Sequence, residues 1–485
     1  MQPSQKNLRP AQDPWTVRIA EKINAGKYTS ALAELLPLVQ SPAVTAQLLE
    51  FTVICYWELK DEKTALALSD LATQRFPECA AIWSQRGNLA LNTGDNVLAQ
   101  ACFRSALQSS PKDLHSLIAL NTLEIFPKGS NFDKKLRNAL RSKTLSKREL
   151  VAIHTAIAQI EQKNGSTRRA FHHYETANQV NIGEYHPDAM EDLLAAQKSV
   201  FQPVRSPSTS RSRPSLVLVG GMPRSGTTLV EAVLSMHPDV RCIGESSALQ
   251  KTLLMARKMA ARRHEPKSDW DWYSLLSETE IAKLRKEFSE MVGLNTEDDR
   301  TIVDKMPLNC LDFGLAHLLI PDVRFVHLLR HPLDCGWSNF STHFKVGNGF
   351  STRLDWIGHL IQITHASALD YASKLGTSFR FQSYKALVEH PETQIQNLLS
   401  HAGLDWDPAC LNPEKAQRVQ RTASMLQVRK PINKDALGKS QEFEDHLAPL
   451  INSLGGQSWL DAWGAPNEKA AAEYIDRDAQ WKAVS

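Results

Sequence analysis

The sequence of 485 residues contains few cysteines, and they are far apart. Its seven cysteines include no CxxC pair. An odd and dispersed set of this kind is typical of free thiols in a reducing compartment rather than of a disulfide framework. No group of Cys and His residues has the spacing of zinc ligands, so we expect no metal site.

Long apolar runs are absent as well. The opening MQPSQKNLRPAQDPW has no apolar run after its basic residues and does not resemble a secretory signal. No stretch approaches the ~18 uninterrupted apolar residues that a membrane span needs. The formal net charge of +3 is too small to indicate a nucleic-acid partner. We therefore expect a cytoplasmic protein with no membrane span and no nucleic-acid partner. A homodimer stays open, because no residue indicates one.

The length and the 42% of hydrophobic residues suffice for two or three globular domains. In the first part, small and aromatic residues recur at the 34-residue period of tetratricopeptide repeats. The best window has the pattern residues Trp83, Gly87, Ala99, Phe103, Ala106 and Pro111. Each such unit is a pair of helices that must stack on its neighbours to bury its apolar face. Residues 117–145 break the register and are either a degenerate repeat or an insertion. We predict a helical tetratricopeptide-like domain over residues 1–195.

A second pattern begins after a stretch rich in Ser, Arg and Pro, which predicts a linker over residues 196–214. Short apolar runs that predict buried strands follow at 216–219, 301–303 and 323–329. They alternate with longer amphipathic runs, such as a predicted helix over 227–236. This alternation favours an α/β domain with a parallel sheet over residues 215–454. The Ala-rich tail 455–485 has no assigned role, and a helix packed on the outside of the domain is the simplest interpretation.

The first predicted strand runs directly into a glycine-bearing turn, and a helix begins near Thr227. A strand, such a turn and a helix N-terminus together form an anion site, because backbone N–H groups and the helix dipole favour negative charge. The spacing from Gly221 to Gly226, followed by Thr227 and Thr228, copies the nucleotide P-loop pattern GxxxxGK[ST]. Thr227 occupies the lysine position of that pattern. A plain strand–helix turn is the alternative, but Arg-Ser-Gly-Thr-Thr after an apolar strand is more specific.

The missing lysine bears on the kind of ligand. Kinases and ATPases use that lysine with a metal-bound hydroxyl to manage the charge of the β- and γ-phosphates. Without the lysine a triphosphate is poorly neutralised, which disfavours a P-loop kinase or NTPase. A sulfonate carries less charge and can be held by Arg224 and backbone donors, with no obligatory metal.

A second anion-binding pattern follows the strand predicted at 323–329. Arg330 stands at the carboxyl end of this strand, where α/β sheets place ligand contacts, and its guanidinium fork suits a terminal phosphate. Ser338 lies eight residues on, in the next predicted helix. The pair indicates a nucleotide with a 3′-phosphate, and a surface ion pair is the alternative.

From about Leu216 to Leu450 the chain resembles the sulfotransferase superfamily. The resemblance is closest to bacterial proteins that join tetratricopeptide repeats to a sulfotransferase domain, and next to tyrosylprotein sulfotransferases. PRSGTTL with HPDVRCIGES resembles the family's 5′-phosphosulfate loop, and VRFVHLLRHPLDCGWSNF resembles its 3′-phosphate element. RTASMLQVRKPIN and HLAPL are similar to the C-terminal signature of the repeat-bearing members. The resemblance implies 3′-phosphoadenosine 5′-phosphosulfate (PAPS) as the donor.

The resemblance also implies roles for single residues. Glu245 would be the general base, Lys305 would stabilise the bridging oxygen and the sulfonate, and Ser424 would donate to the transferred group. Together with Arg224 these residues form the expected catalytic set. The implied donor-binding residues are Arg224, Ser225, Gly226, Thr227, Thr228, Arg330, Ser338, Tyr384, Arg429, Lys430 and Lys439. The residues alone also allow a helix N-terminal glutamate at 245, a surface lysine at 305 and a turn serine at 424.

The chain departs from the family pattern at two places. Tyr384 is followed by Lys-Ala-Leu-Val instead of Glu-Asp-Leu-Val, and Ser440 stands where an aromatic residue often follows the loop cation. The sequence predicts a protein tyrosine, held as a peptide by the repeats, as the acceptor. A glycan, a lipid or a small metabolite stays open, as does a repeat scaffold with an inactive nucleotide-binding domain.

Overall fold

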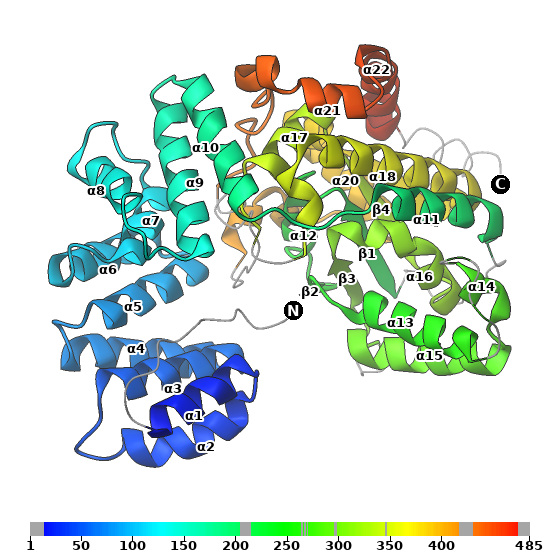
Figure 1. Ribbon diagram of the computed structural model, residues 1–485. Coiled ribbons are helices and arrows are strands. Elements are labelled where there is room, and N and C mark those ends of the chain that lie inside the picture. The colour runs from blue at the N-terminus through cyan, green and yellow to red at the C-terminus, as the bar shows by residue number, and fades with distance from the viewer. Residues whose placement is uncertain are drawn as a thin grey trace. The chain divides into compact units, whose positions relative to one another are not determined.

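The computed structural model describes residues 14–203, 215–262, 265, 268, 270–294, 298–344, 347–416 and 430–473. The chain forms two compact units, and the first ends at Asn181 while the second begins at Ile182 (Figure 1). Among the described helices, none combines the length and the apolar character that crossing a membrane requires.

The described part of the first unit is built of helices. Its helices are α1 (Pro14–Asn24), α2 (Tyr28–Val39), α3 (Ala46–Glu58), α4 (Glu62–Arg75), α5 (Ala80–Thr93), α6 (Asn96–Ser109), α7 (Leu114–Leu123), α8 (Asn131–Ala139), α9 (Lys147–Lys163) and α10 (Thr167–Val180). Consecutive helices pack as hairpins, most extensively α5 on α6 and α9 on α10. Gly87 explains one close approach, because an added Cβ there would lie 2.7 Å from the ring of Phe103. The predicted helical N-terminal region is therefore present.

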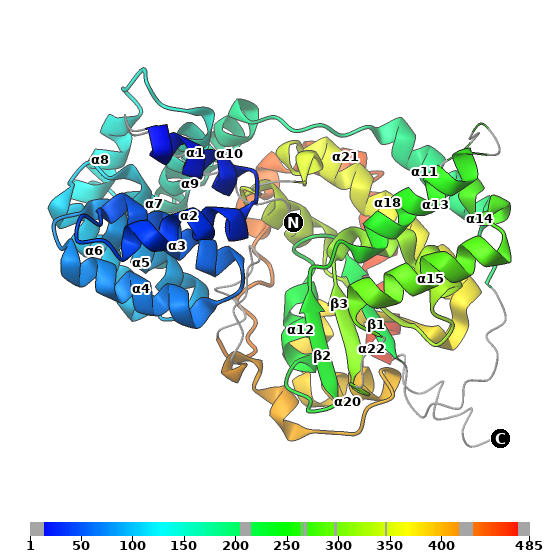
Figure 2. The same cartoon turned by 90° about the horizontal axis from the view of Figure 1, so that it is seen from below.

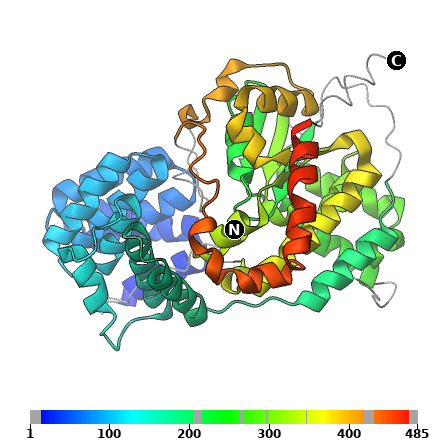
Figure 3. The same ribbon diagram turned by 90° about the horizontal axis from the view of Figure 1, so that it is seen from above.

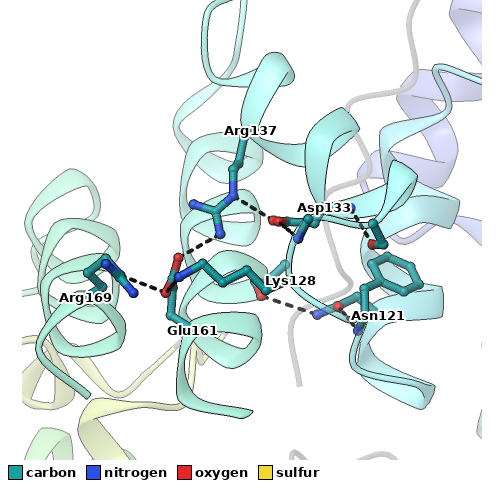
Figure 4. Close-up of polar contacts among 10 residues, drawn as sticks. Asn121, Lys128, Asp133, Arg137, Glu161 and Arg169 are labelled. Carbon is teal, nitrogen blue, oxygen red and sulfur yellow. Dashed lines mark hydrogen bonds and ion pairs between the residues drawn. The ribbon is translucent and has the colours of Figure 1, made fainter. Parts of the chain in front are cut away.

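The stretch that breaks the repeat register holds α7 and the short helix α8. Here the buried carboxylate of Glu161, on α9, accepts hydrogen bonds from Lys128, Arg137 and Arg169 at 2.7–2.9 Å. Arg137 also donates to Asp133 at 2.7 Å (Figure 4). One buried carboxylate thus ties α8, α9, α10 and the loop before α8 together.

The second unit is built on a five-stranded sheet in the order β2-β3-β1-β4-β5, with every pairing parallel. The strands are β1 (Leu216–Gly221), β2 (Val240–Gly244), β3 (Thr301–Lys305), β4 (Arg324–Leu329) and β5 (Phe379–Ser383). The predicted α/β class, the parallel sheet and the three predicted strands are confirmed. β2 and β5 escaped prediction.

Helices cover both faces of this sheet (Figure 2). They are α11 (Pro187–Val200), α12 (Thr227–Leu234), α13 (Ala248–Ala261), α14 (Asp271–Leu275), α15 (Glu278–Val292), α16 (Phe313–Leu319), α17 (Pro332–Phe340), α18 (Leu354–Leu375), α19 (Tyr384–Glu389), α20 (Pro391–His401), α21 (Ala448–Ser453) and α22 (Gln457–Glu473). Leu216 and Leu218 of β1 point to the core beneath α13, α15 and α18, whereas Val217 and Val219 point to the core beneath α12 and α20. The loop after β1 leads to α12 and the loop after β4 leads to α17, on opposite faces. The crevice between β1 and β4 is therefore the switch point at which α/β sheets bind ligands.

Two predicted boundaries differ from the structure. The predicted border between the repeats and the linker, at residue 195, falls inside helix α11. This helix packs on α18, where Gln197 donates to the Ser367 carbonyl and accepts from the Ser367 hydroxyl. Phe201 is fully buried in the same core. The helical domain thus ends near residue 181 rather than 195, because α11 buries its apolar face on the α/β unit. Residues 204–214 of the predicted linker lie outside the described residues.

The C-terminal region also belongs to the α/β unit. Helix α22 contacts β5 and β4, and Figure 3 shows it in red. Its Trp463 is buried against Leu329 and Phe381. The part of the predicted tail that the structure describes is therefore a covering helix of the sheet.

Candidate active site

The loop of residues 222–226 connects β1 to α12 at the carboxyl edge of the sheet. Gly226, with a φ of +109°, precedes the helix and offers no side-chain cap to its first N–H groups. An added Cβ at Gly226 would lie 2.5 Å from Cδ2 of Tyr384, so the tyrosine ring packs directly on the loop. Thr227 and Thr228 are buried. Uncapped N–H groups of a helix N-terminus form an anion site.

Arg224 adopts a left-handed backbone conformation, with a φ of +68°. A non-glycine residue in this region is strained, and such strain concentrates at functional sites. Its side-chain Nε donates to Oγ of Ser338 at 3.0 Å. Burial, and after it the positive charge of Arg330, lowers the pKa of Arg224 to about 10. The loop thus joins α17 through the serine predicted to contact a phosphate.

Arg330 lies where the sequence predicted, at the carboxyl end of β4. It donates from Nη1 to the Arg224 carbonyl at 2.8 Å and from Nη2 to the Ala436 carbonyl at 2.5 Å. Its guanidinium stands 5.2 Å from the centre of the Tyr384 ring. Its Nε is buried and has no hydrogen-bond partner among the described residues, and the same holds for Oγ of Ser225. Two neighbouring guanidinium groups favour an anion between them.

Lys305 ends β3 beside the loop, opposite Val219 in the sheet register. It is fully buried, which excludes the surface lysine that the sequence also allowed. Its Nζ donates to Oε1 of Glu245 at 2.6 Å and lies 3.6 Å from Oε2 of Glu231. The structure therefore pairs the predicted lysine with the predicted base. Glu245 has 27% of its side chain exposed, so it can also meet a second molecule.

Two acidic residues of this group were missed in the sequence. Glu231 lies one turn after Thr227 on α12, and that spacing is the signal that could have placed it on the same helix face. Asp304 precedes Lys305 and is fully buried. Burial, helped by the charges of Glu231 and Glu245, outweighs the lowering effects of Lys305 and of a backbone hydrogen bond from Ser246 and raises the pKa of Asp304 to about 7. The region around Lys305 is therefore rich in carboxylates.

The segment of residues 430–440 is fastened to the first turn of α17. Asp334 accepts from the backbone N–H of Gly438 at 2.8 Å and from the N–H and hydroxyl of Ser440, both at 2.9 Å. Ser440, noted as a departure from the family, thus anchors this segment. Lys430 and Lys439 lie on it with exposed side chains. Ser424 and Arg429 lie outside the described residues.

A model described as "Sulfotransferase family" matches residues 214–408. An uncharacterized protein of Aquifex aeolicus is 28% identical over 82% of this chain and 53% of its own length, so the chain spans about half of that relative. Protein-tyrosine sulfotransferase 1 of Danio rerio is 26% identical over 50% of this chain and 72% of its own. The protein-tyrosine sulfotransferase of Drosophila melanogaster is 28% identical over 54% of this chain and 56% of its own.

Proposed function

We propose that this chain, whose residues 214–408 match a sulfotransferase family model, is a sulfotransferase that takes a sulfonate from PAPS and transfers it to a tyrosine hydroxyl of a protein. PAPS is the general donor of the family. The observation that carries the proposal is the ion pair between the buried Lys305 and the partly exposed Glu245, at the edge of the sheet where β1 leads into the loop of residues 222–226. A proton acceptor and a fixed positive charge stand together beside an anion-binding loop.

The described residues fit such a donor. The loop N–H groups and Arg224 would hold the 5′-phosphosulfate, and Arg330 with Ser338 would hold the 3′-phosphate. Ser225 and Arg330 each have a buried polar atom that lacks a partner among the described residues, which an anionic ligand would satisfy. The Tyr384 ring, packed on Gly226 and Arg330, would face the adenosine. Lys430, Lys439, Ser424 and Arg429 complete the proposed set on the C-terminal segment.

The residues around Lys305 account for the chemistry. Glu245 takes the proton of the acceptor hydroxyl as that oxygen forms a bond to sulfur. The bond from sulfur to the bridging oxygen breaks, and its electron pair stays on the departing phosphate. Lys305 and Arg224 stabilise the negative charge that develops on the sulfonate and the bridging oxygen.

A protein tyrosine is the proposed acceptor because relatives that match half of this chain are protein-tyrosine sulfotransferases. The helical unit supports the same choice, since stacked helical hairpins offer an extended surface for a peptide. The test is transfer from ³⁵S-labelled PAPS to a panel of tyrosine peptides, saccharides, lipids and a cell extract. We expect label on tyrosine peptides and none on their Tyr→Phe counterparts. Label found only on saccharides, lipids or small metabolites would show that the acceptor is not a protein tyrosine. Binding of the adenosine bisphosphate product without any transfer would indicate an inactive scaffold.

A further inference from the structure

Lys305 contacts two carboxylates rather than one. Its Nζ lies 2.6 Å from Glu245 and 3.6 Å from Glu231, and the lysine side chain has no exposed surface. The carboxylates come from different elements, Glu231 from α12 and Glu245 from the turn after β2. Only Glu245 is assigned a role by the proposed function.

The geometry points to Glu231 as a positioning residue that keeps Lys305 charged and in place while Glu245 takes up the proton of the acceptor. This inference rests on the proposed function and adds a residue to it. The proton transfer neutralises Glu245 and so removes the closer counter-charge of a fully buried ammonium group. A buried charge that loses its counter-charge within the protein is strongly unfavourable. The negative charge of Glu231 remains throughout the step.

Asp304, the third carboxylate near Lys305, cannot act as the counter-charge in place of Glu231. Asp304 directly precedes Lys305 on β3, and neighbouring side chains of a strand point to opposite faces of the sheet. Burial also raises the pKa of Asp304 to about 7, so a large share of it is neutral at physiological pH. Glu231 is thus the lasting partner among the charged groups that surround Lys305.

The position of Glu231 also suits a residue that holds Lys305 in place rather than one that takes the proton of the acceptor. Its side chain is 9% exposed, against 27% for Glu245, so an acceptor hydroxyl can reach Glu245 more readily. An added Cβ at Gly244 would lie 3.9 Å from Oε1 of Glu231. One oxygen of Glu231 therefore faces Lys305, while the other lies near the backbone that carries the base.

The first experiment measures the pH dependence of sulfonate transfer in Glu231→Gln. We expect kcat to fall by ~10-fold or more, with the KM for PAPS within about twofold of its original value. When the negative charge of Glu231 is removed, the Lys305 ammonium group loses its proton at a lower pH. Glu245 likewise binds a proton only at a lower pH. Both limbs of the bell-shaped profile should therefore move to lower pH, and Glu231→Asp should restore part of the shift. Asp370→Asn, which removes a carboxylate paired with Lys374 on α18, should leave the profile in place.

A second experiment is independent of turnover. The free energy of unfolding is measured from pH 6 to 9 for Glu231→Gln, Glu245→Gln and the double variant. Because either carboxylate alone compensates Lys305, we expect the double variant to lose more stability than the sum of the single variants. The excess loss of stability in the double variant should shrink as the pH rises. Without either carboxylate, Lys305 binds its proton less tightly in the folded state than in the unfolded state, and such a folded state gains stability with pH.

These outcomes separate the two proposals. An unshifted profile in Glu231→Gln together with an additive stability cycle would overturn the role of Glu231 and leave sulfonate transfer standing. A coupled stability cycle in a protein that transfers no sulfonate to any acceptor would overturn the proposed function, and with it the role of Glu231 in the reaction.

Discussion

At the scale of single residues, the site depends on contacts between positions far apart in the chain. Lys305 and Glu245 are 60 residues apart and form a 2.6 Å hydrogen bond because β2 and β3 are neighbours in the sheet. Their residue types could be predicted from motifs, but their ion pair and the full burial of Lys305 could not, since these follow from the strand order. Glu231 and Asp334 were missed for the same reason, because each acts through a partner that a linear motif does not contain.

The role of Glu245 as the general base can be tested with the variant Glu245→Ala. Removing a general base typically lowers turnover by ~10²–10⁴-fold. Binding of 3′,5′-adenosine bisphosphate should remain near its original affinity, because the proposed phosphate-binding residues, and not the base, would contact this product. Isothermal titration measures the binding, and a coupled assay measures kcat. Full turnover in the variant would remove Glu245 from this role.

The elements of the site differed in how well the sequence predicted them. β1, the loop after it and α12 follow from an apolar run, paired glycines and a helix start, and all lie where predicted. β5 was missed because its sequence FRFQS places a buried Arg380 and a buried Gln382 in the strand, where they bond to each other. β2 was missed because it is a half-buried edge strand that contains an arginine. In both strands, polar residues interrupt the apolar pattern and so hide the strand from pattern analysis.

The geometry of the loop after β1 predicts that Gly226→Ala strongly destabilises the protein. The left-handed φ of +109° strains any side chain, and the new Cβ would meet the Tyr384 ring at 2.5 Å. We expect a loss of ~2–4 kcal/mol in the free energy of unfolding and a weaker affinity for adenosine bisphosphate. Gly376→Ala is the matched control, because Gly376 has a φ of +55° and open space around it. Equal effects of the two substitutions would show that packing against Tyr384 contributes nothing.

The ion-pair network of α8, α9 and α10 predicts a pH-dependent stability for the helical unit. Hydrogen bonds from Lys128, Arg169 and Arg137 outweigh burial and lower the pKa of Glu161 to about 2. Because the pKa of Glu161 is lower in the folded state than in the unfolded state, the Glu161 carboxylate stabilises the fold at pH values above the unfolded pKa. This stabilisation is lost as the pH falls from about 4.5 to 2. Glu161→Gln should lower the free energy of unfolding by ~3 kcal/mol at pH 7, the low end of the range for breaking a buried pair, because the partly exposed cations can turn to water. Chemical denaturation at pH 7 and pH 3 should show this difference shrinking, and a constant difference would refute the role of the charge.

At the scale of the whole molecule, composition changes predicted two units but misplaced their border. Helix α11 has an amphipathic sequence that suits a repeat as well as an α/β domain, so only its contacts reveal where it belongs. Leu193 and Phe201 bury their side chains in the core of the second unit. The family match covers much of that unit, and the helical unit precedes it.

The border can be tested with two truncated chains. A chain of residues 182–485 keeps α11 and should unfold cooperatively and bind adenosine bisphosphate. A chain of residues 196–485 loses most of α11, including Leu193, and should be less stable by several kcal/mol. Thermal melts and product titration of both chains make the comparison. Equal stability of the two would place α11 outside the folding unit.

The central claim is that Lys305, Glu245 and the loop after β1 transfer a sulfonate and not a phosphate. The most direct measurement offers the full-length chain and one tyrosine peptide either ³⁵S-labelled PAPS or γ-³²P-labelled ATP with Mg²⁺, and follows label on the peptide by mass and radioactivity. Because Thr227 stands in place of the P-loop lysine, sulfur label should appear and phosphorus label should not. Phosphorus label on the peptide, with no sulfur label, would contradict the account.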